Sequence, residues 1–306
     1  LYLYGGGSLE DLALSQMIGA VVATLSSICL PCPLLTMGPF KVTKQDLLPK
    51  ANCGACGTAG CRPFAELLVQ GQIEPAKCTV NSKDMNQVIA NFLGVDLGKE
   101  EKRVARLACA GGTHVAYIRA SYGGVESCRA AALVSGGGKG CACGCLGLGD
   151  CAEVCDFDAI HMNRHGLPVV TEADCTACGD CVEVCPKDLF SLHPVSHQLW
   201  VACNNQAFGD EAEKECEVIC TACGRCAQDS PEGLIEIRDN LAVVDYAKNS
   251  LASRVAIERC PTGAIVWLEK GGRVEKGRDA RKVVRKEALQ PELARAGSRS
   301  RISARA

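Results

Sequence analysis

Residues 175–189 read CTACGDCVEVCPKDL and hold four cysteines at the spacing C-x2-C-x2-C-x3-C-P. Part of this stretch is repeated: DCVEVCPKDLF (180–190) matches DCAEVCDFDAI (150–160), thirty residues earlier. A looser copy, RCAQDSPEGLI, covers 225–235, and its closing half reappears as ERCPTGAIVWL at 258–268. Each copy predicts a cysteine loop, a short helical turn and a β-strand.

This spacing is the cysteine pattern of bacterial two-cluster ferredoxins. There, three close cysteines bind one [4Fe–4S] cluster and the fourth, often followed by proline, binds the other cluster. The same crossing predicts two clusters in the first pair of repeats. The predicted ligands are Cys141, Cys145, Cys151 and Cys185 for one cluster, and Cys175, Cys178, Cys181 and Cys155 for the other. The first half is less regular, because its ligand gaps are three and five residues and Asp156 stands where proline is usual.

The second pair of repeats keeps one site and has lost the other. Cys220, Cys223 and Cys226 form a C-x2-C-x2-C run, and the crossing rule makes Cys260 their fourth ligand. The sister site would use positions 230, 250, 253 and 256, which are Ser230, Ser250, Ser253 and Ala256. Loss of all four ligands from one site and none from the other supports the crossed assignment. This module is therefore predicted to hold a single cluster.

A fourth site is predicted near the front, in NCGACGTAGC (52–61). Its ligands would be Cys53, Cys56 and Cys61, with Cys78 as the next cysteine along the chain. Small glycines between the thiols let the backbone wrap closely around a bulky group. A helix is predicted over RPFAELLVQ (62–70), because Pro63 suits a first helical turn.

Seven cysteines remain: Cys29, Cys32, Cys109, Cys128, Cys143, Cys203 and Cys216. Cys109, Cys128, Cys203 and Cys216 are enough in number for a fifth cluster, but buried apolar thiols are an equal alternative. We expect Cys29 and Cys32 to be incidental.

The composition and spacing of the 23 cysteines in this chain of 306 residues narrow the roles that they can have. A disulfide framework is disfavoured by the odd count and by the short C-x2-C and C-x3-C spacings. Structural zinc can also bind four cysteines, but its ligands usually come as two separate knuckles. With 33 Lys+Arg against 35 Asp+Glu and 4% aromatics, neither a basic field nor a base-stacking surface points to nucleic acid.

From Leu12 to Phe40 the chain has 29 residues without Asp, Glu, Lys or Arg. About 20 apolar residues in a helix can cross a bilayer, so this segment predicts a single transmembrane anchor. A secretory signal peptide is the rival interpretation, but the acidic front end argues against it. The lysines that follow place the bulk of the chain on the cytoplasmic side of the inner membrane.

These features together predict an α+β protein with ferredoxin-like βαβ-type modules. The expected parts are a membrane-anchor helix (1–40), a helical four-cysteine domain (41–100), a two-cluster ferredoxin-like domain (101–200), a degenerate one-cluster module (201–270) and a basic, disordered tail (271–306).

The motifs resemble the B subunit of the Rnf (Rsx) complexes, which are ion-translocating ferredoxin:NAD oxidoreductases. The resemblance rests on LPKANCGACGTAGCRPFAE (48–66), GGKGCACGCLGLGDCAEVCDFDAI (137–160), CTACGDCVEVCPKDL, NLAVVD (240–245) and CPTGAI (260–265). The chain departs from the family pattern in the missing second cluster of the last module, in Asp156, and in Cys29, Cys32 and Cys143.

The resemblance implies a membrane-anchored subunit that relays single electrons between a soluble ferredoxin and the other subunits of the complex. No catalytic site of its own is expected. Two alternatives stay open: service in a different membrane or soluble oxidoreductase, and a zinc-held scaffold without a redox role.

Overall fold

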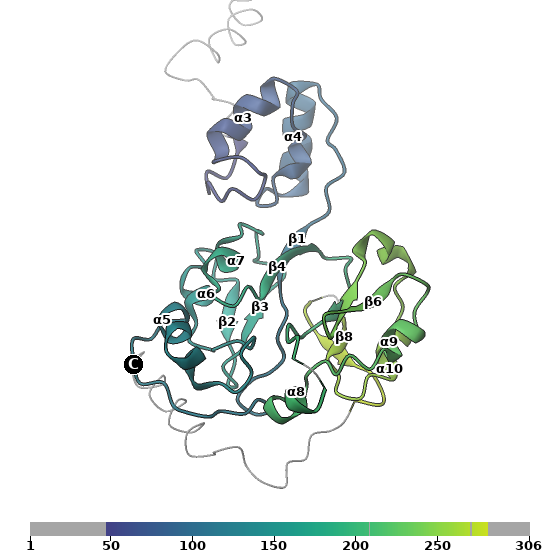
Figure 1. Cartoon of the computed structure of the whole chain (residues 1–306). Coiled ribbons are helices and arrows are strands. Elements are labelled where there is room, and N and C mark those ends of the chain that lie inside the picture. The colour runs from purple at the N-terminus through teal and green to yellow at the C-terminus, as the bar shows by residue number, and fades with distance from the viewer. Residues whose placement is uncertain (1–46, 208, 270, 281–306) are drawn as a thin grey trace, which may run out of the picture. The chain divides into compact units, whose positions relative to one another are not determined.

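The computed structural model describes residues 47–207, 209–269 and 271–280, which fall into two units divided after Gly98 (Figure 1). The expected anchor helix, Cys29 and Cys32 lie outside these residues. Within the described ranges, no helix combines the length and apolar character needed to cross a membrane.

The described part of the first unit is helical, as its sequence predicted. It contains α3 (Cys61–Val69), the 3-10 helix η2 (Pro75–Lys77) and α4 (Lys83–Leu93). Ser82 caps α4, since its hydroxyl accepts a hydrogen bond from the Met85 N–H at 3.1 Å. Phe64 and Leu68 of α3 are buried against Ile89 of α4 and form a small core of this unit.

The second unit contains two successive copies of one arrangement. The first copy runs β1 (Arg103–Leu107), α5 (Cys128–Leu133), η3 (Ser135–Gly138), α6 (Asp150–Glu153), β2 (Ile160–Met162), β3 (Pro168–Val170), α7 (Asp180–Val184) and β4 (Phe190–Pro194). The second runs β5 (Leu199–Val201), α8 (Gly209–Glu215), α9 (Arg225–Gln228), β6 (Ile235–Arg238), β7 (Leu241–Val244), η4 (Tyr246–Leu251), α10 (Val255–Glu258), β8 (Ile265–Leu268) and β9 (Val274–Lys276).

The sheets correct one expectation about topology. Strand β1 pairs with β4, β2 with β3, β5 with β8, β6 with β7, and β8 with β9, and each of these pairs is antiparallel. The expected βαβ-type units do not form, because the helices are single turns and the strands between them are joined as hairpins. Asp239 and Asn240, which link β6 to β7, both have positive φ (47° and 60°), as a tight two-residue hairpin turn requires.

The predicted helical turn followed by a strand is present in every copy of the repeat: α6 precedes β2, α7 precedes β4, α9 precedes β6, and α10 precedes β8. The folded part also extends past the expected boundary at residue 270. Strand β9 pairs with β8 through Val274 opposite Leu268, so part of the segment assigned to the tail belongs to the sheet.

The two copies in the second unit are joined by main-chain and aromatic contacts. The Trp200 indole donates to the Leu107 carbonyl at 2.8 Å, and the Ala110 N–H donates to the Ala202 carbonyl at 2.9 Å. The chain segment after β1 therefore runs beside the segment after β5.

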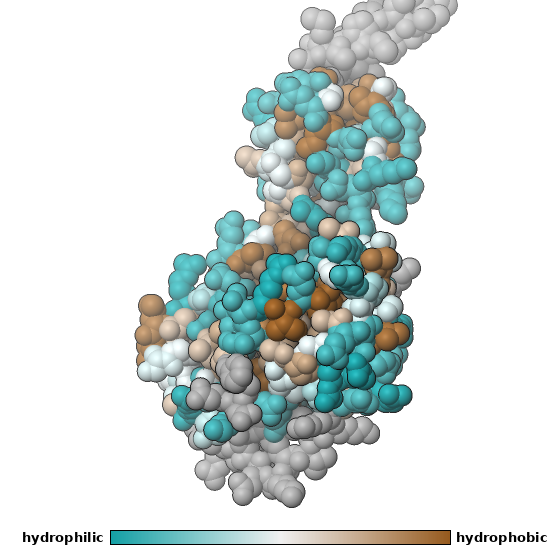
Figure 2. Space-filling model, turned by 45° about the vertical axis from the view of Figure 1, so that its right-hand side comes forward, coloured by the Kyte–Doolittle hydropathy of each residue, from teal (hydrophilic) through white to brown (hydrophobic). Residues whose placement is uncertain are grey.

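On the face drawn in Figure 2, hydrophilic residues cover most of the coloured surface and hydrophobic residues form separate patches.

Candidate iron–sulfur sites

In the first unit, Cys53, Cys56, Cys61 and Cys78 line one hollow (group A). Three of them come from the loop and first turn of α3, and Cys78 follows η2. The Cys61 N–H donates to the Asn52 side-chain oxygen at 2.9 Å, which folds the loop back on itself. Gly60 allows this approach, because a Cβ there would lie 2.8 Å from the same oxygen.

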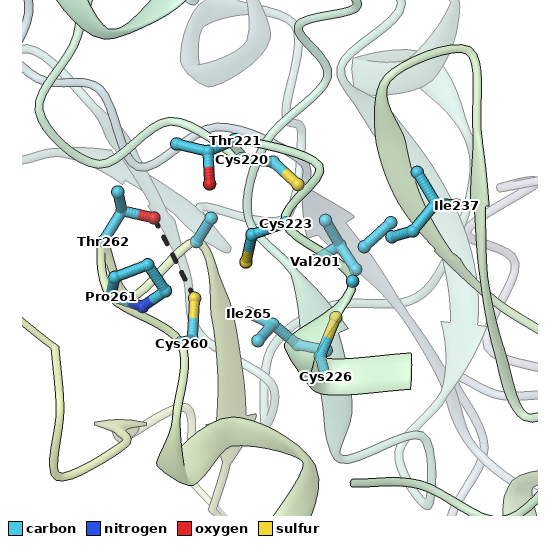
Figure 3. A pocket seen from close by; sticks show the side chains of 13 residues that line it. Val201, Cys220, Thr221, Cys223, Cys226, Ile237, Cys260, Pro261, Thr262 and Ile265 are labelled. Carbon is cyan, nitrogen blue, oxygen red and sulfur yellow. Dashed lines mark hydrogen bonds between the residues drawn. The ribbon is translucent and has the colours of Figure 1, made fainter. Parts of the chain in front are cut away.

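In the last module, Cys220, Cys223, Cys226 and Cys260 line a hollow (group E; Figure 3). Cys220 and Cys223 lie on one loop, Cys226 on α9 and Cys260 just after α10, so the crossing predicted by the repeat brings these four together. Cys223 is exposed, whereas the other three thiols are buried.

At two positions of the missing second site, the residues make ordinary packing and hydrogen-bond contacts. Ala256 is 1% exposed and belongs to a core with Leu234 and Ile257. The Ser230 hydroxyl donates to the Cys226 carbonyl at 2.7 Å.

In the first module, Cys155, Cys175, Cys178 and Cys181 line a third hollow (group B). The Ala105 N–H on β1 donates to the Cys175 Sγ atom at 3.5 Å. Within the loop, Ala177 adopts a positive φ of 60°, and Ala222 of group E has a φ of 53° at the matching place in the repeat. The two CTAC loops therefore share a left-handed residue at the same position.

The remaining predicted set is divided differently from the sequence expectation. Among the described residues, Cys141 has thiol neighbours other than Cys145, Cys151 and Cys185. It lines a fourth hollow together with Cys109, Cys203 and Cys216, which we name group D, and Cys143 lies at the same hollow. The Asn205 side-chain amide, itself 5% exposed, donates to the Cys141 Sγ atom at 3.1 Å.

The place expected for Cys141 is taken by Cys128. Burial raises the pKa of the Cys151 thiol to about 12, and the next contributions come from Cys128, Cys185 and Cys181, which must therefore lie close by. Burial also raises the pKa of Cys145 to about 12, with a further contribution from Cys109 and a smaller one from Cys128. We name Cys128, Cys145, Cys151 and Cys185 group C.

Asp150, the residue before Cys151, fixes the position of Cys128. Its carboxylate accepts hydrogen bonds from the Cys128 N–H at 2.7 Å, the Arg129 N–H at 3.2 Å and the Ser127 hydroxyl at 2.9 Å. Burial alone would raise the pKa of Asp150, but these three donors together lower it. The start of α5 is thus attached to the start of α6.

The predicted ligand sets did not join Cys128 to Cys151, although the sequence contains a signal for this pairing. The thirty-residue period aligns Cys145 with Cys175 and Cys151 with Cys181, and it places Leu148 opposite Cys178. Leu148 has no thiol, so one ligand of group C must come from outside the aligned positions. Cys141 has no counterpart in the repeat either, so the repeat does not favour Cys141 over Cys128.

Several thiols of these groups are strongly desolvated. Burial raises the pKa of Cys181, Cys203 and Cys226 to about 12 and that of Cys216 to about 11, and neighbouring thiols add to each shift. In the chain alone, these side chains are therefore protonated near neutral pH. Binding of a metal group as thiolates must release protons, so binding is weaker in acid.

The donor sets suit iron–sulfur clusters. Thiolate sulfur is the soft ligand that such clusters use. The hollows of groups E, B and A are each lined by four cysteines and that of group D by five, which is enough for one cluster with four thiolate ligands at each. The described residues contain no set of three or more Cys, His, Asp or Glu side chains placed to hold a single metal ion. When bound, the clusters supply one-electron oxidation and reduction.

Three groups of the second unit touch through hydrogen bonds to sulfur. The Cys145 N–H of group C donates to the Cys109 Sγ atom of group D at 3.4 Å. The Cys220 N–H of group E donates to the Cys203 Sγ atom of group D, also at 3.4 Å. Group D therefore lies between the two modules and contacts a group in each.

Comparisons with known proteins also indicate iron–sulfur clusters. A family model described as a putative Fe-S cluster matches residues 48–80, which contain all of group A. The B subunit of the proton-translocating ferredoxin:NAD(+) oxidoreductase complex of Clostridium ljungdahlii is 40% identical over 239 residues, or 78% of this chain and 84% of that protein.

Two further relatives carry related names. The B subunit of the Na(+)-translocating ferredoxin:NAD(+) oxidoreductase complex of Acetobacterium woodii is 37% identical over 78% of this chain and 69% of its own length. The B subunit of the ion-translocating oxidoreductase complex of Methanosarcina acetivorans is 33% identical over 84% of this chain and 97% of its own length. The resemblance seen in the motifs is thus confirmed over most of the chain, which belongs to the B-subunit family of the ion-translocating ferredoxin:NAD oxidoreductase (Rnf) complexes.

Proposed function

We propose that the chain relays single electrons through five [4Fe–4S] clusters, one in each of groups A to E, as the electron-transfer subunit of an Rnf-type membrane complex. The names of the relatives support a ferredoxin as the soluble partner and the other subunits of the complex as the second partner. The apolar segment from Leu12 to Phe40 would anchor the chain in the inner membrane, with its bulk on the cytoplasmic side.

The observation that carries this proposal is the contact of group D with groups C and E through the Cys109 and Cys203 sulfurs. Cys181 of group B contributes to the raised pKa of Cys151 in group C, so these two thiols lie near each other. Groups B, C, D and E thus form one continuous series across both modules, which is the arrangement that a relay of single electrons needs.

The metal content tests the cofactor assignment. Anaerobically purified full-length chain should contain about twenty irons and about twenty acid-labile sulfides, from five cubanes with four thiolates each. Reduction with dithionite should produce electron paramagnetic resonance (EPR) signals. A protein filled with zinc and silent in EPR would contradict the proposal and leave a structural scaffold.

The partner is tested separately. Reduced soluble ferredoxin, mixed anaerobically with the oxidised chain, should bleach the visible absorption of the clusters. Bleaching by dithionite but not by ferredoxin would show a relay with a different donor, as expected for a subunit of another oxidoreductase.

The anchor is tested by carbonate extraction of membranes, which should leave the chain in the pellet; release into the supernatant would contradict the anchor.

A further inference from the structure

Lys139 is a lysine inserted between two of the cysteine groups, and neither the repeat nor the family resemblance gives it a role. Its side chain lines the hollow of group D. Its ammonium donates to the Cys145 carbonyl at 2.6 Å and to the Gly111 carbonyl. Cys145 belongs to group C, so this cation is held at the boundary between groups C and D.

The second anchor of the ammonium lies directly against group D. A Cβ placed on Gly111 would lie 3.1 Å from the Cys216 Sγ atom and 3.7 Å from the Cys109 Sγ atom. The lysine is therefore attached to the residue that touches two thiols of this group.

The loop leaves room for this side chain. A Cβ on Gly144 would lie between 3.1 and 3.3 Å from three atoms of Lys139, closer than ordinary van der Waals contact. Any larger residue at position 144 would push the lysine away from its two carbonyl partners.

The charge lining the hollow of group D differs from that of the others described above. The hollows of groups A and E are lined by no charged side chain, and that of group B is lined by the carboxylate of Asp180. Group D has the ammonium of Lys139 and the amide donor of Asn205. The residues that line the hollow of group D therefore include one cation and no carboxylate.

Reduction adds a negative charge to a cluster. A nearby cation and hydrogen bonds to sulfur stabilise the added charge and raise the reduction potential, whereas a carboxylate lowers it. We propose that Lys139 raises the reduction potential at group D above the potentials at groups B and E, so that electrons collect at the junction between the two modules. This inference rests on the proposed electron relay.

The test is an EPR-monitored redox titration of the anaerobically purified full-length chain. The signal of group D is identified by its loss in Cys216→Ala. In Lys139→Met, which keeps the length of the side chain and removes the charge, this signal should titrate at a more negative potential with unchanged iron content. Lys139→Arg should keep the original potential. Lys248→Met serves as the matched control and should change nothing, because Lys248 is exposed and donates to the Glu232 carbonyl away from the hollows.

Gly144→Ala gives a second, independent variant. It keeps the charge but displaces it, so the same signal should shift in the same direction by a smaller amount. An unchanged potential in Lys139→Met with full iron content would overturn the inference. So would the loss of four irons in Lys139→Met but not in Lys139→Arg, since Lys139 would then be needed for cluster retention. A chain without iron or EPR signals in its unaltered form would instead overturn the proposed function.

Discussion

The main-chain N–H of Cys220 donates to the Sγ atom of Cys203 at 3.4 Å. This contact places the first thiol of group E beside group D, although the two thiols belong to different loops. The loop of Cys220 is held in turn by Thr262, whose hydroxyl donates to the Ile219 carbonyl at 2.7 Å. The junction between the modules is therefore part of the packed structure.

Removal of a group D thiol should break the series of clusters at this junction. Cys203→Ala is expected to lose about four irons per chain, because one cubane loses a ligand. Group D lies between groups B and C on one side and group E on the other, so ferredoxin should still reduce the clusters on the side where it binds quickly, while the signals beyond group D should appear more slowly. Iron analysis and rapid-freeze EPR measure both effects. Reduction on both sides at the original rates would show that electrons do not pass through group D.

Cys143 provides the matched control, because it lines the same hollow but is not assigned to a group. Cys143→Ala should keep all of the iron. If Cys143→Ala lost four irons and Cys141→Ala lost none, Cys143 would be the ligand in place of Cys141.

The division of thiols between groups C and D makes a separate prediction. Cys128→Ala and Cys151→Ala should remove the same EPR signal, because Asp150 holds Cys128 beside Cys151. Cys141→Ala and Cys216→Ala should remove a second, different signal. The contradictory result is that Cys141→Ala removes the signal that Cys151→Ala removes, which is the grouping that sequence spacing suggested.

Groups A, B and E illustrate how much of the candidate sites sequence spacing captures. Their members lie in short runs, at a fixed repeat distance or, for Cys78, next along the chain. Counting along the chain therefore puts together the same cysteines that the structure places around one hollow. Groups C and D are different. Cys109 lies near Cys203 because the Ala110 N–H donates a hydrogen bond to the Ala202 carbonyl. Cys128 lies near Cys151 because the Asp150 carboxylate accepts a hydrogen bond from the Cys128 N–H at the start of α5. No local pattern encodes such tertiary contacts.

The same reasoning applies to the strands. Period and turn residues located the helical turns and strands of the repeat, but pairing partners are chosen by three-dimensional packing. Antiparallel pairing and the addition of β9 to β8 therefore had no signal in the spacing.

The buried ion pair between Arg106 and Glu172 should contribute to stability. The Arg106 Nη1 atom lies 2.7 Å from Glu172 Oε1, and the two side chains are only 9% and 10% exposed. Glu172→Ala leaves the guanidinium buried without its partner, so we expect a loss of about 3 kcal/mol in the free energy of unfolding. Anaerobic thermal denaturation followed by circular dichroism would show a lower midpoint.

An exposed ion pair in the same unit gives the control. Glu236→Ala removes the partner of Arg238, but these side chains are 51% and 62% exposed, so we expect a much smaller loss in the free energy of unfolding than for Glu172→Ala. Equal effects of Glu172→Ala and Glu236→Ala would contradict a special contribution of the buried pair.

His193 should make the second unit sensitive to acid. Its Nδ1 atom lies 3.2 Å from His197 Nδ1, and its ring packs against Trp200 and Tyr246 at centroid distances of 4.9 and 4.8 Å. Burial, followed by the charges of His197 and Arg106, lowers the pKa of His193 from 6.5 to about 4. Glu101 acts in the opposite direction on the pKa of His197, which burial lowers.

A lowered pKa means that the folded state favours the neutral ring. The contribution of His193 to stability is therefore complete above pH 6.5 and is lost as the pH falls toward 4. Because the ring is only half-buried and solvent screens its charge, we expect a magnitude of about 2 kcal/mol, less than the full shift would give. The glutamine in His193→Gln cannot be protonated in this pH range. Between pH 7.5 and pH 5, the melting temperature of this variant should therefore fall less than that of the unaltered chain. Anaerobic thermal melts at the two pH values, followed by near-ultraviolet circular dichroism, measure the difference. The exposed His161 on β2 supplies the control, because His161→Gln should keep the original pH dependence. The same pH dependence in His193→Gln and in the unaltered chain would show that another group controls the response to acid.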